Sequence, residues 1–101
     1  MSYEFAVVFE NREQDVTEVI GFELWEDACA EVQKLFREQM EYYGVKIPEI
    51  EFDDSIDLNA DVYVDDDFEI MGYGKEEWFS ARMRDCGVTL ISVSAHRIYR
   101  G

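Results

Sequence analysis

The sequence predicts an α+β domain with two helices and a mostly antiparallel sheet, in the order β-β-α-β-β-α-β. Three observations lead to this prediction. Two N-terminal segments are rich in β-branched and aromatic residues, residues 25–43 repeat apolar side chains at helical spacing, and residues 49–70 alternate apolar with acidic side chains. A chain of 101 residues is short, so we expect one domain over residues 1–101.

The first two strands are expected at "YEFAVVFE" (3–10) and "VTEVIGFEL" (16–24), joined by the polar turn "NREQD". A helix is expected next, from Trp25 to Tyr43. Glu26 and Asp27 suit the positive end of its dipole, and Gly44 suits its C-terminal cap. The residues expected on its buried face are Ala28, Cys29, Val32, Leu35, Phe36, Met40 and Tyr43.

A second helix is expected from Lys75 to Cys86, because acids open this segment, arginines lie late in it and Gly87 follows it. The segment "VTLISVSAHRIYR" (88–100) then predicts a long strand. Cys29 and Cys86 are isolated, each within an expected helix, so both are expected to be buried free thiols.

The segment from Glu49 to Ile70 contains ten carboxylates in 22 residues and no lysine or arginine. Nine of its eleven even-numbered residues are apolar, and eight of its eleven odd-numbered residues are acidic. Alternation with a period of two predicts strands with one buried and one solvated face. A helix is disfavoured because acids four residues apart would repel one another.

The alternation breaks only at Asp54 and Asp66, within "DDS" and "DDD", and Asp and Ser favour turns. We therefore expect a short strand, a turn near 54, a strand near 56–64, a turn near 66 and a strand near 67–71. The odd-numbered residues would form an acidic face. The residues predicted to contact a partner are Glu49, Glu51, Asp53, Asp57, Asp61, Tyr63, Asp65, Asp67 and Glu69.

The formal net charge is −15, and it is unevenly distributed. Residues 1–74 carry 21 acids and four bases, whereas residues 75–101 carry three acids and five bases. Such a surface repels nucleic acid and anionic membranes and attracts basic proteins. Direct nucleic-acid binding and membrane binding are therefore disfavoured. The N-terminus lacks the features of a signal peptide, so we expect a cytoplasmic protein.

In size, acidity, aromatic content and lack of catalytic residues, the chain resembles the small phage-encoded inhibitors of host defence. These include anti-CRISPR and anti-restriction proteins that mimic DNA. The resemblance implies a stoichiometric inhibitor in the host cytoplasm. Its acidic face would occupy the basic nucleic-acid-binding site of a CRISPR effector, nuclease or similar protein. On that face, Tyr63 would be a natural hot-spot residue.

Two alternatives give the acids another role. In the first, they form an ordinary solvated face of a protein-interaction or salt-adapted domain. In the second, they bind divalent cations weakly. Asp57, Asn59, Asp61 and Asp65 fall where a calcium loop has ligands, but Val62 and Phe68 replace its required glycine and glutamate. We therefore expect no dedicated metal site and no cofactor.

Enzymatic activity is not expected. His96 shares its parity with Ser92 and Ser94, but no glycine-rich elbow surrounds either serine, and the chain has no phosphate-binding loop. The C-terminal arginines leave two possibilities open. They would either meet the acidic face of a second copy in a homodimer or neutralise part of the protein's own charge. These arginines are Arg82, Arg84, Arg97 and Arg100.

Overall fold

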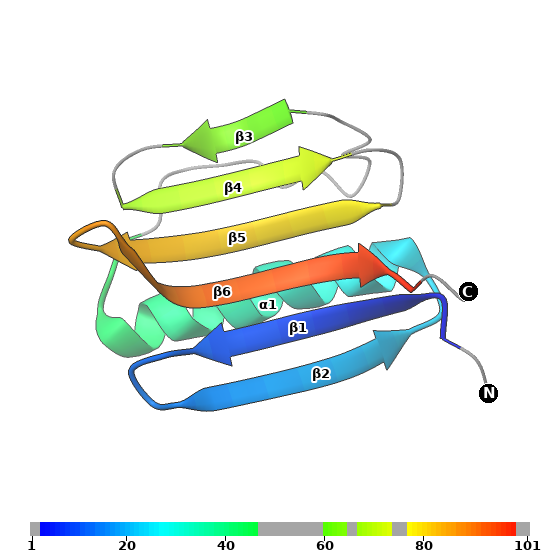
Figure 1. Ribbon diagram of the computed structural model, residues 1–101, viewed down its shortest axis with the longest axis horizontal. Helices are drawn as coiled ribbons and strands as arrows, with labels where there is room; N and C mark the ends of the chain where they lie inside the picture. The colour runs from blue at the N-terminus through cyan, green and yellow to red at the C-terminus, as the bar shows by residue number, and fades with distance from the viewer. Residues whose placement is uncertain (1–2, 47–59, 65–66, 74–76, 99–101) are drawn as a thin grey trace.

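The computed structural model describes residues 3–46, 60–64, 67–73 and 77–98. In this part of the chain, one helix covers one face of a six-stranded antiparallel sheet and leaves the other face open (Figure 1). Across the sheet the strands follow the order β2-β1-β6-β5-β4-β3. The elements are β1 (Phe5–Asn11), β2 (Val16–Phe22), α1 (Trp25–Tyr43), β3 (Ala60–Val64), β4 (Phe68–Tyr73), β5 (Trp78–Asp85) and β6 (Val88–Arg97).

The predicted N-terminal hairpin and the helix from Trp25 to Tyr43 are confirmed. Gly44 ends the helix in the left-handed conformation, with φ of 67°. Leu35 and Tyr43 are only partly buried but pack against the core. The helix packs on β6, β1, β5 and β2. Its buried residues are Trp25, Ala28, Cys29, Val32, Phe36 and Met40.

The predicted fold class is wrong in its helix count and element order, because the segment expected to be the second helix contains strand β5. Phe79, Ala81 and Met83 are buried beneath α1, whereas Arg82 and Arg84 lie on the open face. This alternation has a period of two. Of the residues that suggested the two ends of a helix, Glu77 instead lies just before the strand, and Arg82 and Arg84 lie on its open face.

The glycine interpreted as a helix stop belongs to the β5–β6 turn. Cys86 and Gly87 both have positive φ, 51° and 80°, as a two-residue turn of type I′ requires. Cys86 is therefore exposed in a turn, and the prediction that it is a buried helical thiol is wrong. Cys29 is buried, as predicted, and neither cysteine forms a disulfide.

The segment from Glu49 to Ile70, which we call the acidic segment, is only partly described. Strand β4 confirms the strand expected near 67–71, and Phe68 and Ile70 are buried while Glu69 lies on the open face. In β3, however, the backbone register shifts between Asp61 and Tyr63, which pair with Met71 and Ile70. Those two partners occupy opposite faces of β4. The predicted alternation is thus interrupted by a bulge. The turns expected near 54 and 66 lie outside the described residues.

A buried polar side chain ties the N-terminal hairpin to the helix. Asn11 is 1% exposed at the end of β1. Its amide donates hydrogen bonds to Gln39 Oε1, at 3.0 Å, and to Tyr43 Oη, at 3.1 Å. The Asn11 Oδ1 atom accepts a bond from the Gln14 backbone N–H at 3.1 Å. The hairpin turn is therefore anchored to the last turns of α1.

Candidate interaction surface

The predicted partner-binding residues fall into three groups. Glu49, Glu51, Asp53, Asp57 and Asp65 lie outside the described residues. Asp61 and Tyr63 belong to β3, whose backbone alone is described. Asp67 is exposed immediately before β4, and Glu69 is half-buried within it.

Glu69 is neutralised by the protein's own arginines. Its Oε1 atom lies 3.4 Å from Arg82 Nη1, and its Oε2 atom bonds to Arg84. The register explains this cluster, since Glu69 is directly opposite Arg82 on the neighbouring strand. Arg97 likewise forms an ion pair with Glu77, at 3.8 Å. Glu69 therefore contributes little free charge to an acidic face.

These ion pairs bear on the two possibilities for the C-terminal arginines. Arg82, Arg84 and Arg97 each have an acidic partner within the chain, and Arg100 lies outside the described residues. Neutralisation of the protein's own charge therefore accounts for three of the four. The homodimer stays a prediction.

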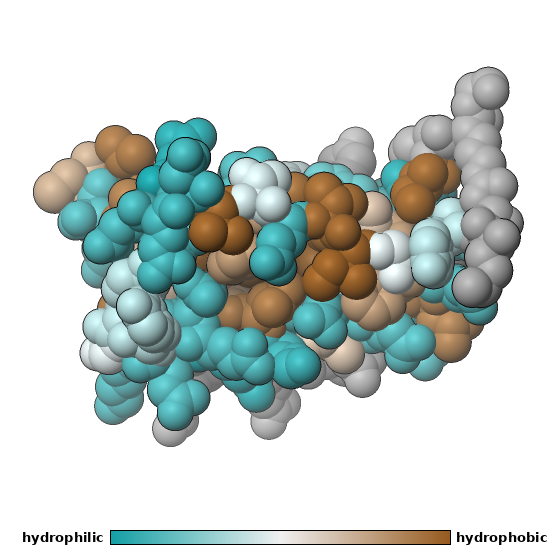
Figure 2. All heavy atoms as spheres, turned by 90° about the horizontal axis from the view of Figure 1, so that it is seen from below, coloured by the Kyte–Doolittle hydropathy of each residue, from teal (hydrophilic) through white to brown (hydrophobic). Residues whose placement is uncertain are grey.

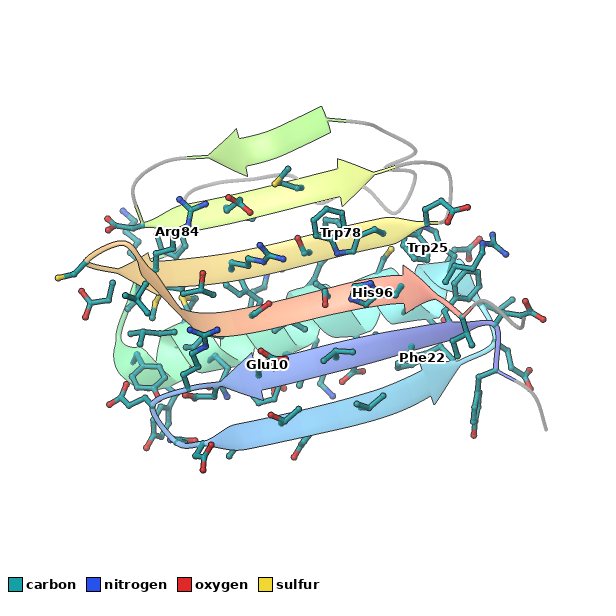
Figure 3. The ribbon with its side chains drawn as sticks, viewed as in Figure 1. Glu10, Phe22, Trp25, Trp78, Arg84 and His96 are labelled. Carbon is teal, nitrogen blue, oxygen red and sulfur yellow. The ribbon has the colours of Figure 1, made fainter. Side chains whose placement is uncertain are left out.

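The centre of the open face holds an aromatic and polar cluster (Figure 3). Trp78 and His96 stack with ring centroids 6.4 Å apart, and the Arg82 guanidinium lies 5.6 Å from the Trp78 ring. Ser94 Oγ is 2.7 Å from His96 Nε2. The Trp78 Nε1 and Ser80 Oγ atoms are buried, and no described residue is their hydrogen-bond partner. Of these side chains, Trp78 and Arg82 are of the types enriched among the hot spots of protein interfaces.

Burial lowers the pKa of His96, and the nearby Arg82 charge lowers it further. The imidazole is therefore neutral near pH 7, a state that also allows a histidine to act as a base. The Ser94–His96 contact is the nearest approach to a catalytic pair in the described part of the chain. The absence of enzymatic activity stays a prediction. Among the described residues, no group of three or more His, Cys, Asp or Glu side chains is placed to hold a metal ion.

A second acidic surface runs along the free edge of β2. No lysine or arginine occurs from Glu13 to Gln33. Six acids of this segment are exposed, and none of them forms a salt bridge within the described part of the chain. We call this surface the acidic edge. It consists of Glu13, Asp15, Glu18, Glu23, Glu26 and Asp27.

The acidic edge is less dense in acids than residues 49–70, so acid density alone does not reveal it. The available signal was the run of 21 residues from Glu13 to Gln33, which carries seven acids and no base. Figure 2 views the molecule from the β2 side and shows hydrophobic residues flanked by hydrophilic ones. Val19 is the most exposed apolar residue of β2, at 67%. Val19 pairs with Val8 on the open face, whereas Glu18 pairs with Phe9 on the helix side, so β2 presents an apolar residue on one face and an acid on the other.

Comparisons with known proteins give no relative: no family model, no curated protein and no solved structure matches this chain. Within the described residues, no helix has both the length and the hydrophobicity needed to span a membrane.

Proposed function

We propose that this protein is a non-catalytic inhibitor that uses its acidic surfaces to occupy the basic nucleic-acid-binding site of a partner protein. The proposed partners are CRISPR effectors and nucleases. Lysines and arginines in such sites bind a line of phosphates, and correctly spaced carboxylates would compete for the same groups. Binding would require no covalent chemistry, metal ion or cofactor.

The observation that carries this proposal is the contrast between balanced and unbalanced charge. On β4 and β5, the described Glu69 carboxylate is paired with two arginines. Along the acidic edge, six exposed acids have no such cation among the described residues. Charges that only neutralise a fold are expected to pair within it, whereas unpaired like charges repel one another. The helix dipole compensates Glu26 and Asp27 in the first turn of α1, but the other four acids are a cost to the isolated protein that a basic partner would relieve.

The rigidity of the fold supports the same role. The acidic edge follows a strand that pairs with β1 along all seven of its residues. Acids held on a strand lose little conformational freedom on binding, so more of the interaction energy remains as affinity. Glu26 and Asp27 continue the surface onto the first turn of α1, which is also ordered.

A displacement assay tests the proposal. Purified CRISPR effectors and nucleases would each bind a fluorescently labelled DNA duplex, and this protein would be added at increasing concentration. For at least one target, we expect the fluorescence anisotropy of the labelled DNA to fall as the DNA is released, at a ratio of this protein to the target near one. The DNA itself should stay chemically unchanged. An unrelated acidic protein of similar net charge serves as the control. Equal displacement by that control, or none across the panel, would refute the proposal.

A further inference from the structure

The outer side of β2 is a free strand edge. β2 is the last strand of the sheet, and no described strand lies beyond it (Figure 1). Natural proteins usually protect such edges with proline, lysine, bulges or very short strands. The seven residues of β2, "VTEVIGF", contain neither proline nor lysine, and they pair with β1 in unbroken register. The one charged residue of β2 is Glu18, which disfavours pairing with another acidic strand and leaves the edge available for backbone pairing with a basic one.

Two backbone hydrogen bonds establish the direction in which the backbone N–H and C=O groups of β1 point. The Ile98 N–H donates to Glu4 O at 2.8 Å, and the Arg12 N–H donates to Leu90 O at 2.9 Å. Both bonds connect an even-numbered residue flanking β1 to the β6 side of the sheet, whereas the Glu4 N–H donates to Phe22 O, an even-numbered residue of β2, at 3.1 Å. Backbone groups of successive residues in a strand point to alternate sides. The odd-numbered residues of β1 therefore point towards β2.

The register then fixes the outward groups of β2. Odd-numbered residues of β1 are opposite even-numbered residues of β2, as in the pairs Val7–Ile20 and Phe9–Glu18. The even-numbered residues of β2 thus face β1, and the odd-numbered ones direct their N–H and C=O groups away from the sheet. The outward-pointing residues are Thr17, Val19 and Gly21.

Charge decides which kind of strand fits this edge. Asp15 and Glu23 are exposed at its two ends, and Glu18 is exposed at its middle. The net charge of −15 makes pairing between two copies of this chain unfavourable. A lysine- or arginine-rich strand would instead meet the acids while its backbone bonds to the outward groups. Val19, which is 67% exposed, supplies apolar contact at the centre.

We propose that β2 binds an extended basic segment of its partner by strand addition, so that the partner segment becomes a seventh strand of the sheet. In this mode backbone hydrogen bonds supply affinity and alternate side chains supply selectivity. The basic character of the segment rests on the function proposed above. The backbone pairing rests independently on the register and the free edge.

Hydrogen exchange tests the pairing directly. The probe is a capped seven-residue peptide of alternating lysine and valine. In the free protein, we expect the amides of Thr17, Val19 and Gly21 to exchange fast and those of Glu18 and Ile20 to exchange slowly. With the peptide bound, the three odd-numbered amides should slow by about tenfold or more, because each gains an acceptor. The control is the same peptide with N-methyl groups on alternate amides, which keeps the charge and blocks pairing.

Two variants at one position separate backbone pairing from side-chain contact. Val19→Pro removes the outward N–H, a change that an edge strand tolerates. Val19→Thr keeps the N–H and the β-branched shape. We expect Val19→Pro to weaken peptide binding about tenfold, and Val19→Thr to change it less than about threefold. Circular dichroism would confirm that each variant is folded, and hydrogen exchange on the natural protein needs no variant.

The outcomes distinguish this inference from the proposed function. Slowed exchange at the three odd-numbered amides, lost with the N-methylated peptide, supports strand addition. Binding of both peptides without that exchange pattern overturns strand addition and leaves the proposed acidic function standing. If neither basic peptide binds, strand addition fails, and the displacement assay alone decides the proposed function. Equal binding of a peptide with glutamate in place of lysine overturns the charge-based choice of partner.

Discussion

His96 illustrates how a single residue acquires its chemistry from its neighbours. Alone on a strand it is an ordinary imidazole, but Trp78 stacks on one side of it and Ser94 Oγ lies 2.7 Å from its Nε2 atom. Burial and the Arg82 charge lower its pKa, so the folded state favours the neutral ring. The sequence indicated that Ser94 and His96 share a face. It did not indicate that β5 would bring Trp78 and Arg82 to the same place.

The lowered pKa of His96 predicts a pH effect on stability. The unfolded chain binds a proton near pH 6.5, whereas the folded chain resists it, so stability falls as pH falls from about 6.5 towards the folded-state value. His96→Gln should remove this contribution. The two proteins would be compared by urea denaturation at pH 7.5, 6.5 and 5.5. A stability difference that stays constant across this range would contradict the assignment.

Asn11 gives a second residue-scale prediction. Its side chain is 1% exposed and joins Gln39, Tyr43 and the hairpin turn. Asn11→Ala leaves these groups without a partner and should lower the free energy of unfolding by about 2 kcal/mol. Urea denaturation measures this. Gln14→Ala is the matched control, since only its backbone N–H takes part, and a similar loss in that variant would refute the role of Asn11.

At the scale of elements, the β5–β6 turn explains why one helix was wrongly predicted. Cys86 and Gly87 both require positive φ, and asparagine adopts this conformation more readily than cysteine. Cys86→Asn should raise the free energy of unfolding by about 0.5 kcal/mol, and Gly87→Ala should lower it by about 1 kcal/mol. Urea denaturation of both variants would check the signs. A helix in this segment would instead be insensitive to Cys86→Asn.

The elements predicted correctly are those whose local signals agree. In α1, helical spacing of apolar residues coincides with acids at the start and Gly44 at the end. In β5, the end signals favoured a helix while Phe79, Ala81 and Met83 alternated with polar residues. The alternation decided the structure, because burying three side chains against α1 outweighs favourable helix ends. Local sequence signals do not predict tertiary packing of this kind.

The candidate surface was predictable in its chemistry more than in its position. Net charge indicated a basic partner, but the pairing of Glu69 with Arg82 and Arg84 depends on strand register. The bulge between Asp61 and Tyr63 likewise has no local signal such as glycine. The acidic edge becomes a surface only because β2 is the last strand of the sheet.

For the whole molecule, salt separates the proposed function from salt adaptation. A salt-adapted protein would unfold at low ionic strength and gain stability as salt is added. We expect this protein to stay folded at about 10 mM salt, and we expect added salt to raise its melting temperature only modestly. Partner binding should instead weaken steeply by about 0.15 M salt, because exposed charges are screened over about 8 Å at that concentration. Thermal melting and binding assays over the same salt series would show it. Unfolding at low salt would favour salt adaptation.

A pair of matched charge reversals in the displacement assay tests most directly whether the acidic surfaces bind the basic site of a partner. One variant carries Asp15→Lys, Glu18→Lys and Glu23→Lys on the acidic edge; the other carries Asp57→Lys, Asp61→Lys and Asp65→Lys in the acidic segment. Both have a net charge of −9. We expect both variants to remain folded and at least one to lose about tenfold or more in affinity, since each rim charge is worth up to about 1 kcal/mol. Undiminished displacement by both variants would contradict the proposed binding.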